Sequence, residues 1–269
     1  IIMDWFQAVF LALIQGLTEF LPVSSSAHLI LPSQILGWQD QGIAFDVAVH
    51  LGTLIAVVLY FRADVLSITG GSIKAIQQRQ TNEHFLMGVA VVIGTIPAVI
   101  MGGLFHDFIS QELRSAWVIA CTTLIFGVLL WAADSKGSRV LQQHQMTLKF
   151  ALIIGCAQAV ALIPGTSRSG ITITAALFLG FDRTSSARFS MLLSIPLILA
   201  AGLLETLKLV KTEGPVLWDM IILGTLVSGV SAYLCIHTFL RLLDRIGMLP
   251  FVIYRMLLGV FLIFFIALA

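Results

Sequence analysis

The sequence predicts an all-α protein that crosses a membrane several times. Three observations predict this class: the composition, the length of the apolar runs, and two apolar segments that polar turns interrupt. Of the 269 residues, 58% are hydrophobic and 11% are charged, and the mean hydropathy is +1.01. Soluble domains carry about 25% charged residues, so this chain lies well outside that class. The net charge of +1 is uninformative about nucleic acid, but no basic run could follow a phosphate backbone, so no nucleic-acid partner is expected.

Six uninterrupted apolar runs have the length of about 20 residues that a membrane-crossing helix needs. They cover residues 43–61, 85–105, 116–133, 189–207, 219–240 and 250–268. Polar connections are expected at 62–84, 106–115, 134–147, 181–188, 208–218 and 241–249. We predict one membrane domain that spans residues 1–269.

Two further apolar segments are interrupted by turn-forming residues. Pro22 and a run of three serines divide residues 5–36, and Pro164 with Gly165 divides residues 148–180. Irregular backbone at membrane depth is tolerated only where protein buries it or where it lines a wet cavity. We therefore predict that each segment is a re-entrant helix–turn–helix rather than a crossing.

The distribution of lysine and arginine predicts the orientation of the chain. Residues 62–84 and 134–149 each contain three basic side chains, whereas the loop 106–115 contains only Arg114. Basic loops stay in the cytoplasm, which places both termini outside. The first re-entrant segment then enters from the outer face and the second from the cytoplasmic face. Since three crossings follow each of them, the pattern is typical of an inverted-topology repeat, with repeats at about 1–133 and 148–269.

The first turn is preceded by a candidate cation site. Gln15 and Glu19 are four residues apart, so on a helix they share one face. A carboxylate and a carboxamide oxygen suit a hard divalent cation, Mg²⁺ or Ca²⁺, that keeps part of its water shell. The alternative is a helix-packing hydrogen bond that involves a protonated Glu19.

The turn itself carries candidate phosphate-binding and catalytic residues. Ser24, Ser25 and Ser26 come where the second half-helix begins, and His28 lies in its first turn. Serine there can cap backbone amides, and hydroxyls with exposed N–H groups can also hold an anion. His28 could act as a general acid–base or as a nucleophile.

The second turn looks like a diverged copy of the first. Pro22 and Pro164 are 142 residues apart. Aligning these prolines pairs three positions: Ser24 with Thr166, Ser25 with Ser167, and Ser26 with Arg168.

The second turn supplies a guanidinium where the first has a hydroxyl. Arg168 is flanked by hydroxyls and glycines, namely Gly165, Thr166, Ser167, Ser169 and Gly170. Such an arginine suits bidentate phosphate binding. A structural ion pair with Glu19 is the alternative, and the two roles are compatible. A carboxylate, a histidine and an arginine around one anion cradle together indicate phosphoryl chemistry.

Other ionisable residues are weaker candidates. Asp46 and His50 share a helical face near the start of the first crossing, where lining the site or a packing role is expected. Arg255, in the last apolar run, is expected to snorkel to a surface or to pair internally. The remaining histidines, His84, His106, His144 and His237, lie in or beside loops and are expected to be solvated.

The motifs resemble those of undecaprenyl-diphosphate phosphatases, the bacitracin-resistance proteins. E-F-L-P-V-S-S-S-A-H at 19–28 and P-G-T-S-R-S-G at 164–170 are similar to the two signature motifs of that family. The likeness continues through F-D-V-A-V-H-L-G-T at 45–53 and P-F-V-I-Y-R at 250–255.

The resemblance implies a bacterial inner-membrane enzyme with an inverted-repeat fold, a divalent cation and an active site open to the periplasm. It implies hydrolysis of undecaprenyl diphosphate to the monophosphate and inorganic phosphate, which recycles the lipid carrier of peptidoglycan precursors. By motif, Gln15 and Glu19 match the family's (Glu/Gln)-x-x-x-Glu pair, Ser25 and His28 its first loop, and Ser167 and Arg168 its second. Many members have Glu where this chain has the neutral Gln15, which shifts cation binding towards Glu19.

Two other function classes stay open at this point. An inverted repeat with broken helices is also the architecture of transporters and lipid flippases, and a non-catalytic lipid-binding scaffold is a third class. We expect a polyprenyl diphosphate lipid substrate and contact with membrane lipid; a homodimer is one assembly that the sequence allows. For the attacking group, Ser25 with His28 as its proton partner is preferred over His28 itself or an activated water.

Overall fold

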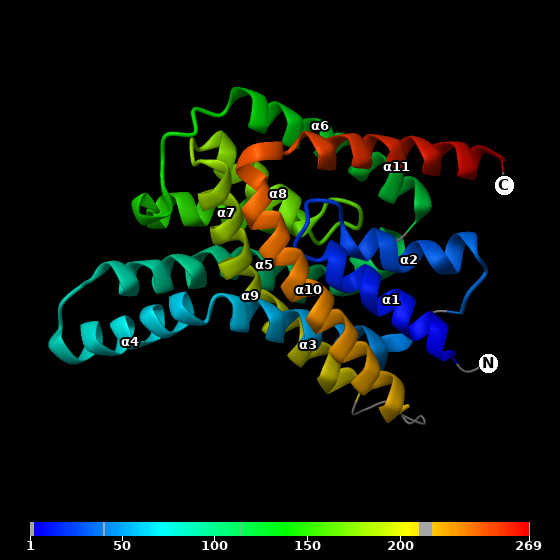
Figure 1. Cartoon of the computed structure of the whole chain (residues 1–269), viewed down its shortest axis with the longest axis horizontal. Helices are drawn as coiled ribbons and strands as arrows, with labels where there is room; N and C mark the ends of the chain where they lie inside the picture. Colours follow the sequence, from blue (N-terminus) through cyan, green and yellow to red (C-terminus); the bar gives the residue numbers. More distant parts are fainter. Residues whose placement is uncertain (1–2, 40, 114, 210–216, 269) are drawn as a thin grey trace.

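The computed structural model describes residues 3–39, 41–113, 115–209 and 217–268 (Figure 1). This part of the chain is helical, and its one β-type contact is the isolated bridge between Leu141 and Phe181. The helices are α1 (Trp5–Thr18), α2 (Ser25–Ile35), α3 (Gly42–Tyr60), α4 (Arg62–Gln78), α5 (Glu83–Glu112), α6 (Ala116–Lys136), α7 (Leu148–Val160), α8 (Arg168–Phe178), α9 (Arg183–Leu209), α10 (Trp218–Ile246) and α11 (Leu249–Leu268), with a short 3₁₀ turn, η1 (Gln143–Gln145).

Among the described residues, six helices are long and apolar enough to cross a membrane, which confirms the predicted number. They are α3, α5, α6, α9, α10 and α11. The connection predicted at 181–188 is wrong in its length, because α9 already begins at Arg183. The Asp182 carboxylate accepts a hydrogen bond from the Ser185 amide at 2.6 Å, so the polar residues of 183–188 form capped first turns of the helix rather than a loop.

The connection predicted at 62–84 is also wrong, because most of it forms α4. Its first turn is fixed by Asp64, which accepts from Arg188 of α9 at 2.9 Å. Val65 and Ile68 pack against the main apolar core, and they are three residues apart on one helical face. Because this apolar stripe is narrow, residues 62–78 look polar and the sequence did not predict a helix there. Packing against other elements stabilises α4.

The two interrupted segments form pairs of short helices, α1 with α2 and α7 with α8. Trp5 and Leu148 begin the first helix of each pair, and Ser25 and Arg168 begin the second, so the two pairs are offset by 143 residues. The alignment through the prolines, at 142, is therefore one residue out of register. Arg168 is therefore equivalent to Ser25 rather than to Ser26, because the second turn has one more residue between its proline and the start of its helix.

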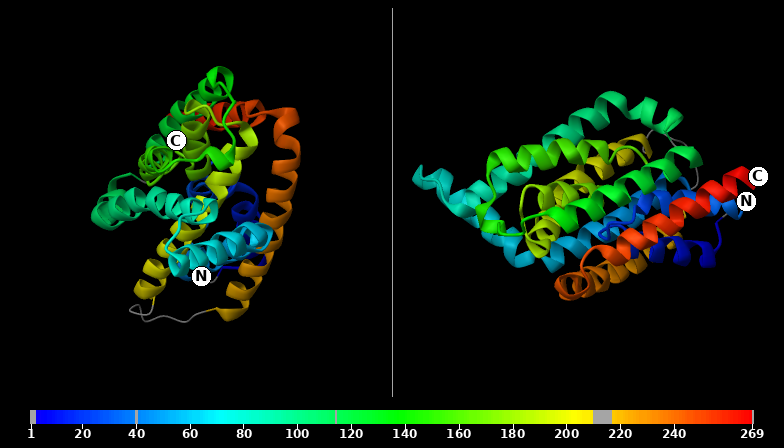
Figure 2. Two further views of the ribbon diagram at one scale, coloured as in Figure 1. Left: turned by 90° about the vertical axis from the view of Figure 1, so that its left-hand side faces the viewer. Right: turned by 90° about the horizontal axis from the view of Figure 1, so that it is seen from above.

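The packing relates the two halves of the chain. Helix α1 packs on α10 and α7 packs on α5, while α3 lies beside α9 and α6 beside α11. Taken in order, α1, α3, α5 and α6 of the first half correspond to α7, α9, α10 and α11 of the second. A two-fold relation between the halves would exchange the α1–α10 contact with the α7–α5 contact and would keep the α3–α9 and α6–α11 contacts. Figures 1 and 2 show the start of α1 and the end of α11 at one end of the molecule, with α4 at the other. The two ends of the described chain thus lie at one end of the molecule, while the orientation in the membrane and the path of the hairpins stay predictions.

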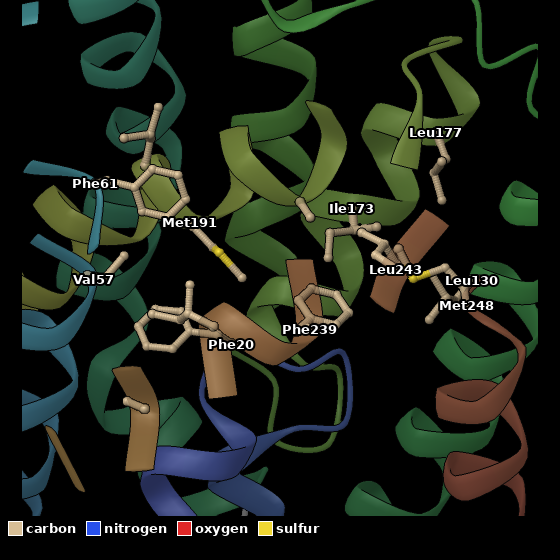
Figure 3. Packing of buried hydrophobic residues seen from close by; sticks show 14 of the residues in the cluster. Phe20, Val57, Phe61, Leu130, Ile173, Leu177, Met191, Phe239, Leu243 and Met248 are labelled. Carbon is tan, nitrogen blue, oxygen red and sulfur yellow. The ribbon is translucent and has the colours of Figure 1, made fainter. Parts of the chain in front are cut away.

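A buried apolar cluster holds the first turn in place. It draws on α3, α6, α8, α9, α10 and α11. Phe20, directly after Glu19, is fully buried in this cluster, where Figure 3 shows it with Phe239 and Met191. Burial of an aromatic side chain stabilises by about 1.5–3 kcal/mol, so the turn is anchored next to its carboxylate.

The crossing of α7 over α5 gives a test of the fold. A Cβ atom on Gly155 would lie 2.4 Å from the Gly94 carbonyl oxygen, a backbone atom that cannot move aside. We expect Gly155→Ala to lower the free energy of unfolding by about 1–3 kcal/mol. Thermal unfolding in detergent measures this.

Gly103→Ala is the matched control, because no atom lies within 4 Å of a Cβ at that position. We expect this change to be neutral or stabilising, since alanine favours helix by about 1 kcal/mol over glycine. An unfolding temperature for Gly155→Ala at or above that of the parent chain would contradict the packing.

Candidate active site

The carboxylate of Glu19 joins the two turns. It is 8% exposed and lies at the end of α1. Its Oε1 accepts from Arg168 Nη2 at 2.8 Å, across 149 positions of sequence. Its Oε2 accepts from Ser25 Oγ at 2.7 Å and from Gln15 Nε2 at 3.0 Å. Four of the residues that the sequence selected, Gln15, Glu19, Ser25 and Arg168, thus form one hydrogen-bonded cluster.

Arg168 is oriented by contacts on three sides. Besides Glu19, its Nη1 donates to the carbonyl oxygen of Ser190 on α9 at 3.1 Å. Its guanidinium carbon lies 5.8 Å from the centre of the Phe20 ring. A neighbouring hydroxyl, Ser169 Oγ, donates to the carbonyl oxygen of Leu21 at 2.7 Å and ties the turns a second time. The guanidinium is therefore held at the junction, with donors beyond those that Glu19 uses.

Both turns contain a serine in an unusual backbone conformation. Ser24 has φ 73° and Ser167 has φ 72°, a region that favours glycine. Such strain persists where the surrounding structure imposes it, often at functional sites. Each serine hydroxyl lies within hydrogen-bonding distance of the hydroxyl two residues on, Ser26 at 3.2 Å and Ser169 at 3.3 Å.

The two helix starts differ in capping. Ser167 Oγ accepts from the Gly170 amide at 3.1 Å and caps α8, whereas Ser24 makes no such bond to α2. The first-turn amides of α2 are therefore available to an anion beside Ser25 and Arg168.

Arg255 holds the backbone of both turns together. This side chain is 0% exposed and comes from α11. Its guanidinium donates to five carbonyl oxygens at 3.0–3.4 Å, one in the first turn, two in the second and two on α6: Pro22, Gly165, Thr166, Thr122 and Thr123. Of the two alternatives from the sequence, snorkelling is wrong, and the internal partners are carbonyl groups rather than a carboxylate.

Little space is left for a side chain at the two glycines of the second turn. Gly165 has φ 87°, and a Cβ there would lie 2.6 Å from the carbonyl oxygen of Ile119. A Cβ on Gly170 would lie 3.1 Å from Arg255 Nη1. The hydroxyl of Thr166 is buried and has no hydrogen-bond partner among the described residues. Gly165 therefore packs closely against α6, and Gly170 packs against Ser167 and Arg255, while the predicted phosphate-binding role of both glycines stays a prediction.

His28 is fixed by two contacts outside the carboxylate cluster. Its Nδ1 lies 2.7 Å from the Ser24 carbonyl oxygen, which can only accept, so Nδ1 carries a proton. Its Nε2 bonds the hydroxyl of Tyr254, whose ring stacks on the imidazole with centroids 5.6 Å apart. The expected pair of Ser25 with His28 is therefore not formed, because Ser25 donates to Glu19 and both imidazole nitrogens have other partners.

His50, a weaker candidate from the sequence, lies next to the carboxylate cluster. It lies on α3 with its Nε2 4.0 Å from Glu19 Oε2. A histidine in an otherwise apolar crossing was the available signal. The other histidines with described side chains, His84, His144 and His237, are exposed as expected, and His106 lies outside the described side chains.

Comparison with known proteins identifies the family. The family described as bacitracin resistance protein BacA matches residues 8–261. The chain belongs to this BacA family. It is 62% identical to an undecaprenyl-diphosphatase of Alcanivorax borkumensis, over 98% of this chain and 100% of that protein. It is 58% identical to undecaprenyl-diphosphatase 1 of Pseudoalteromonas translucida, over 99% of this chain and 100% of that protein.

For this BacA-family chain, the Arg255 contacts give a second test. We expect Arg255→Lys to lower the free energy of unfolding by at least about 2 kcal/mol, because one ammonium cannot reach the same set of carbonyl groups and some stay buried without a donor. Thermal unfolding in detergent measures the loss. Arg241→Lys is the control, since Arg241 is exposed on α10 and its side chain contacts the exposed His237. Equal stability of the two variants would contradict the role of Arg255.

Proposed function

We propose that this protein hydrolyses undecaprenyl diphosphate to undecaprenyl phosphate and inorganic phosphate, and so recycles the lipid carrier for peptidoglycan synthesis. The observation that carries the proposal is the cluster around Glu19, which brings a serine hydroxyl and an arginine from separate turns onto one carboxylate. The names of the related proteins, undecaprenyl-diphosphatase, support it.

The diphosphate binds between Arg168 and the start of α2. Arg168 offers a planar fork of donors, and the uncapped first turn of α2 offers backbone amides at the positive end of a helix. Ser24, Ser26, Thr166, Ser167 and Ser169 supply further hydroxyls around the same space. Charge on the phosphoryl group in flight is offset by the guanidinium and these dipoles.

An apolar cavity beside the second turn suits part of the polyprenyl tail. Its volume is about 710 Å³, and its lining includes Leu162 and Ile163, which directly precede Pro164. The opposite wall is formed by α5, at Pro97, Ile100 and other apolar residues. A tail that lies here keeps its diphosphate end at the turns.

The site residues fit a divalent cation held mainly by Glu19. The Gln15 side chain is 0% exposed, and its Oε1 has no hydrogen-bond partner, so a rotation of the amide would offer this oxygen beside the carboxylate. No group of three His, Cys, Asp or Glu side chains comes together among the residues described. A cation such as Mg²⁺ or Ca²⁺ would thus keep waters and take substrate phosphate oxygens as ligands. It would supply neutralising charge at the diphosphate.

Ser25 is the attacking group in this proposal. When its Oγ forms a bond to the terminal phosphorus, the bond from phosphorus to the bridging oxygen breaks and the lipid monophosphate leaves. The hydroxyl proton passes to Glu19, which already accepts it at 2.7 Å. Water then cleaves the bond from phosphorus to Oγ, which releases phosphate and restores the serine. His28 would exchange protons with the leaving group or the water through Nε2, after this nitrogen has released the hydroxyl of Tyr254.

The location follows from the predicted orientation. Basic loops in the cytoplasm place both termini outside, and the first turn then enters from the outer face. We infer a multi-pass protein of the bacterial inner membrane whose active site opens to the periplasm.

Phosphate release from undecaprenyl diphosphate in detergent tests the function. We expect release by the wild-type protein, its loss in excess EDTA and its return with added Mg²⁺ or Ca²⁺. Glu19→Ala and Arg168→Ala should each lower turnover by about 10³-fold, the scale of losing one preorganised charge at a transition state. Movement of the lipid in vesicles without any hydrolysis would instead support a transporter.

The nucleophile is tested separately. We expect Ser25→Ala to lower turnover by about 10³-fold or more, because the attacking oxygen is lost. Ser33→Ala is the control from the same helix, since its hydroxyl bonds only the local Ile30 carbonyl oxygen. Near-normal turnover by Ser25→Ala together with its loss in His28→Ala would transfer the role to His28.

A further inference from the structure

The imidazole of His50 is oriented by its own helix. Its Nδ1 lies 2.7 Å from the carbonyl oxygen of Asp46, one turn earlier on α3. Because a carbonyl oxygen can only accept, Nδ1 carries a proton. In the neutral ring Nε2 then presents a lone pair, and this atom faces Glu19 Oε2 at 4.0 Å.

Two acceptor atoms that face each other are stabilised by a positive group between them, which is either a proton on His50 Nε2 or a cation. Glu19 Oε2 and a neutral His50 Nε2 would repel, and 4.0 Å is too long for a direct hydrogen bond. A divalent cation bonds imidazole nitrogen and carboxylate oxygen at about 2.0–2.4 Å each, so it fits between these atoms with little movement. A metal-bound histidine usually donates its other N–H to a backbone carbonyl or carboxylate, which is the bond that Asp46 accepts here.

The surroundings of Glu19 and His50 favour a cation bound between them over a direct contact of the two side chains. The His50 side chain is 36% exposed and that of Glu19 is 8% exposed, so the imidazole lies on the outer side of the pair. The orphaned Gln15 Oε1, buried on the face of α1 that bears Glu19, is an independent sign of a missing ligand. Together these residues offer a carboxylate oxygen, an amide oxygen and an imidazole nitrogen.

We propose that His50 Nε2 is a direct ligand of the divalent cation at Glu19, and that this nitrogen makes the site favour Mn²⁺ or Co²⁺ over Ca²⁺. The proposal rests on the cation site of the proposed function. Imidazole suits transition metals, whereas Ca²⁺ takes oxygen ligands almost exclusively. Helix α3 thereby contributes a ligand to a site whose other residues come from the two turns and α1.

Binding of Mn²⁺ to the detergent-solubilised full chain tests this without turnover. Electron spin-echo envelope modulation detects a nitrogen bonded to Mn²⁺, and titration gives the affinities for Mn²⁺ and Ca²⁺. We expect nitrogen modulation in the wild type and its loss in His50→Gln, which replaces the nitrogen by an amide of similar reach. Mn²⁺ affinity should fall by about tenfold or more, and Ca²⁺ affinity by less than about threefold. His144→Gln, at an exposed residue of η1, should leave all three readouts unchanged.

The outcomes separate this proposal from the one on which it rests. Nitrogen modulation that is absent from the wild type, or that persists in His50→Gln, overturns the role of His50. If Glu19→Gln abolishes Mn²⁺ binding at the same time, the cation site of the proposed function stands without His50. If Glu19→Gln binds Mn²⁺ like the wild type, both the cation site and the His50 ligand are wrong.

Discussion

The structure depends on satisfying the backbone of two turns that interrupt apolar helices. Carbonyl groups in such turns have no helical partner, and in the protein interior no bulk water replaces that partner. Arg255 meets this constraint with a single buried guanidinium that donates to carbonyl groups of both turns and of α6. Because one rigid, planar guanidinium binds both turns, the distance between the turns is limited by the fixed geometry of that group.

The chemistry follows from that separation. Once the turns are held together, Glu19 from one and Arg168 from the other meet at 2.8 Å, and Ser25 shares the same carboxylate. The ion pair is not by itself a strong source of stability, since burying two charges costs about as much as their attraction returns. The ion pair matters for position. It holds the Glu19 carboxylate, the Ser25 hydroxyl and the Arg168 guanidinium around one space, beside the uncapped start of α2. In the proposed mechanism, substrate phosphate competes for Arg168 and releases Glu19 to act on Ser25.

Much of this arrangement could be predicted from the sequence, and the failures have physical causes. Apolar runs near 20 residues gave the six crossings because length and hydropathy decide insertion. The two interrupted segments indicated Gln15, Glu19, Ser25 and Arg168 as candidate site residues, because polar groups within apolar segments are costly without a function. Helix α4 was missed because its apolar stripe is narrow and its stability comes from contacts with distant elements.

The contacts of Arg255 and His50 could not be predicted for a related reason. Arg255 binds backbone carbonyls, and any residue type can supply these, so no side-chain pattern marks its partners. His50 meets Glu19 through the packing of α3 near the end of α1, which a linear motif does not encode. The register of the second turn, 143 rather than 142, depends on where α8 begins, and this is set by the Ser167 cap.

The central claim is that the two turns form one catalytic site through Glu19 and Arg168. A double-mutant cycle on kcat/KM for phosphate release tests it most directly, with Glu19→Gln, Arg168→Met and the double variant. If both residues act on the same transition state, the double variant should lie within about tenfold of the worse single variant. Losses that multiply, so that the double variant falls by the product of the two single effects, would show that the turns act independently and would contradict the account.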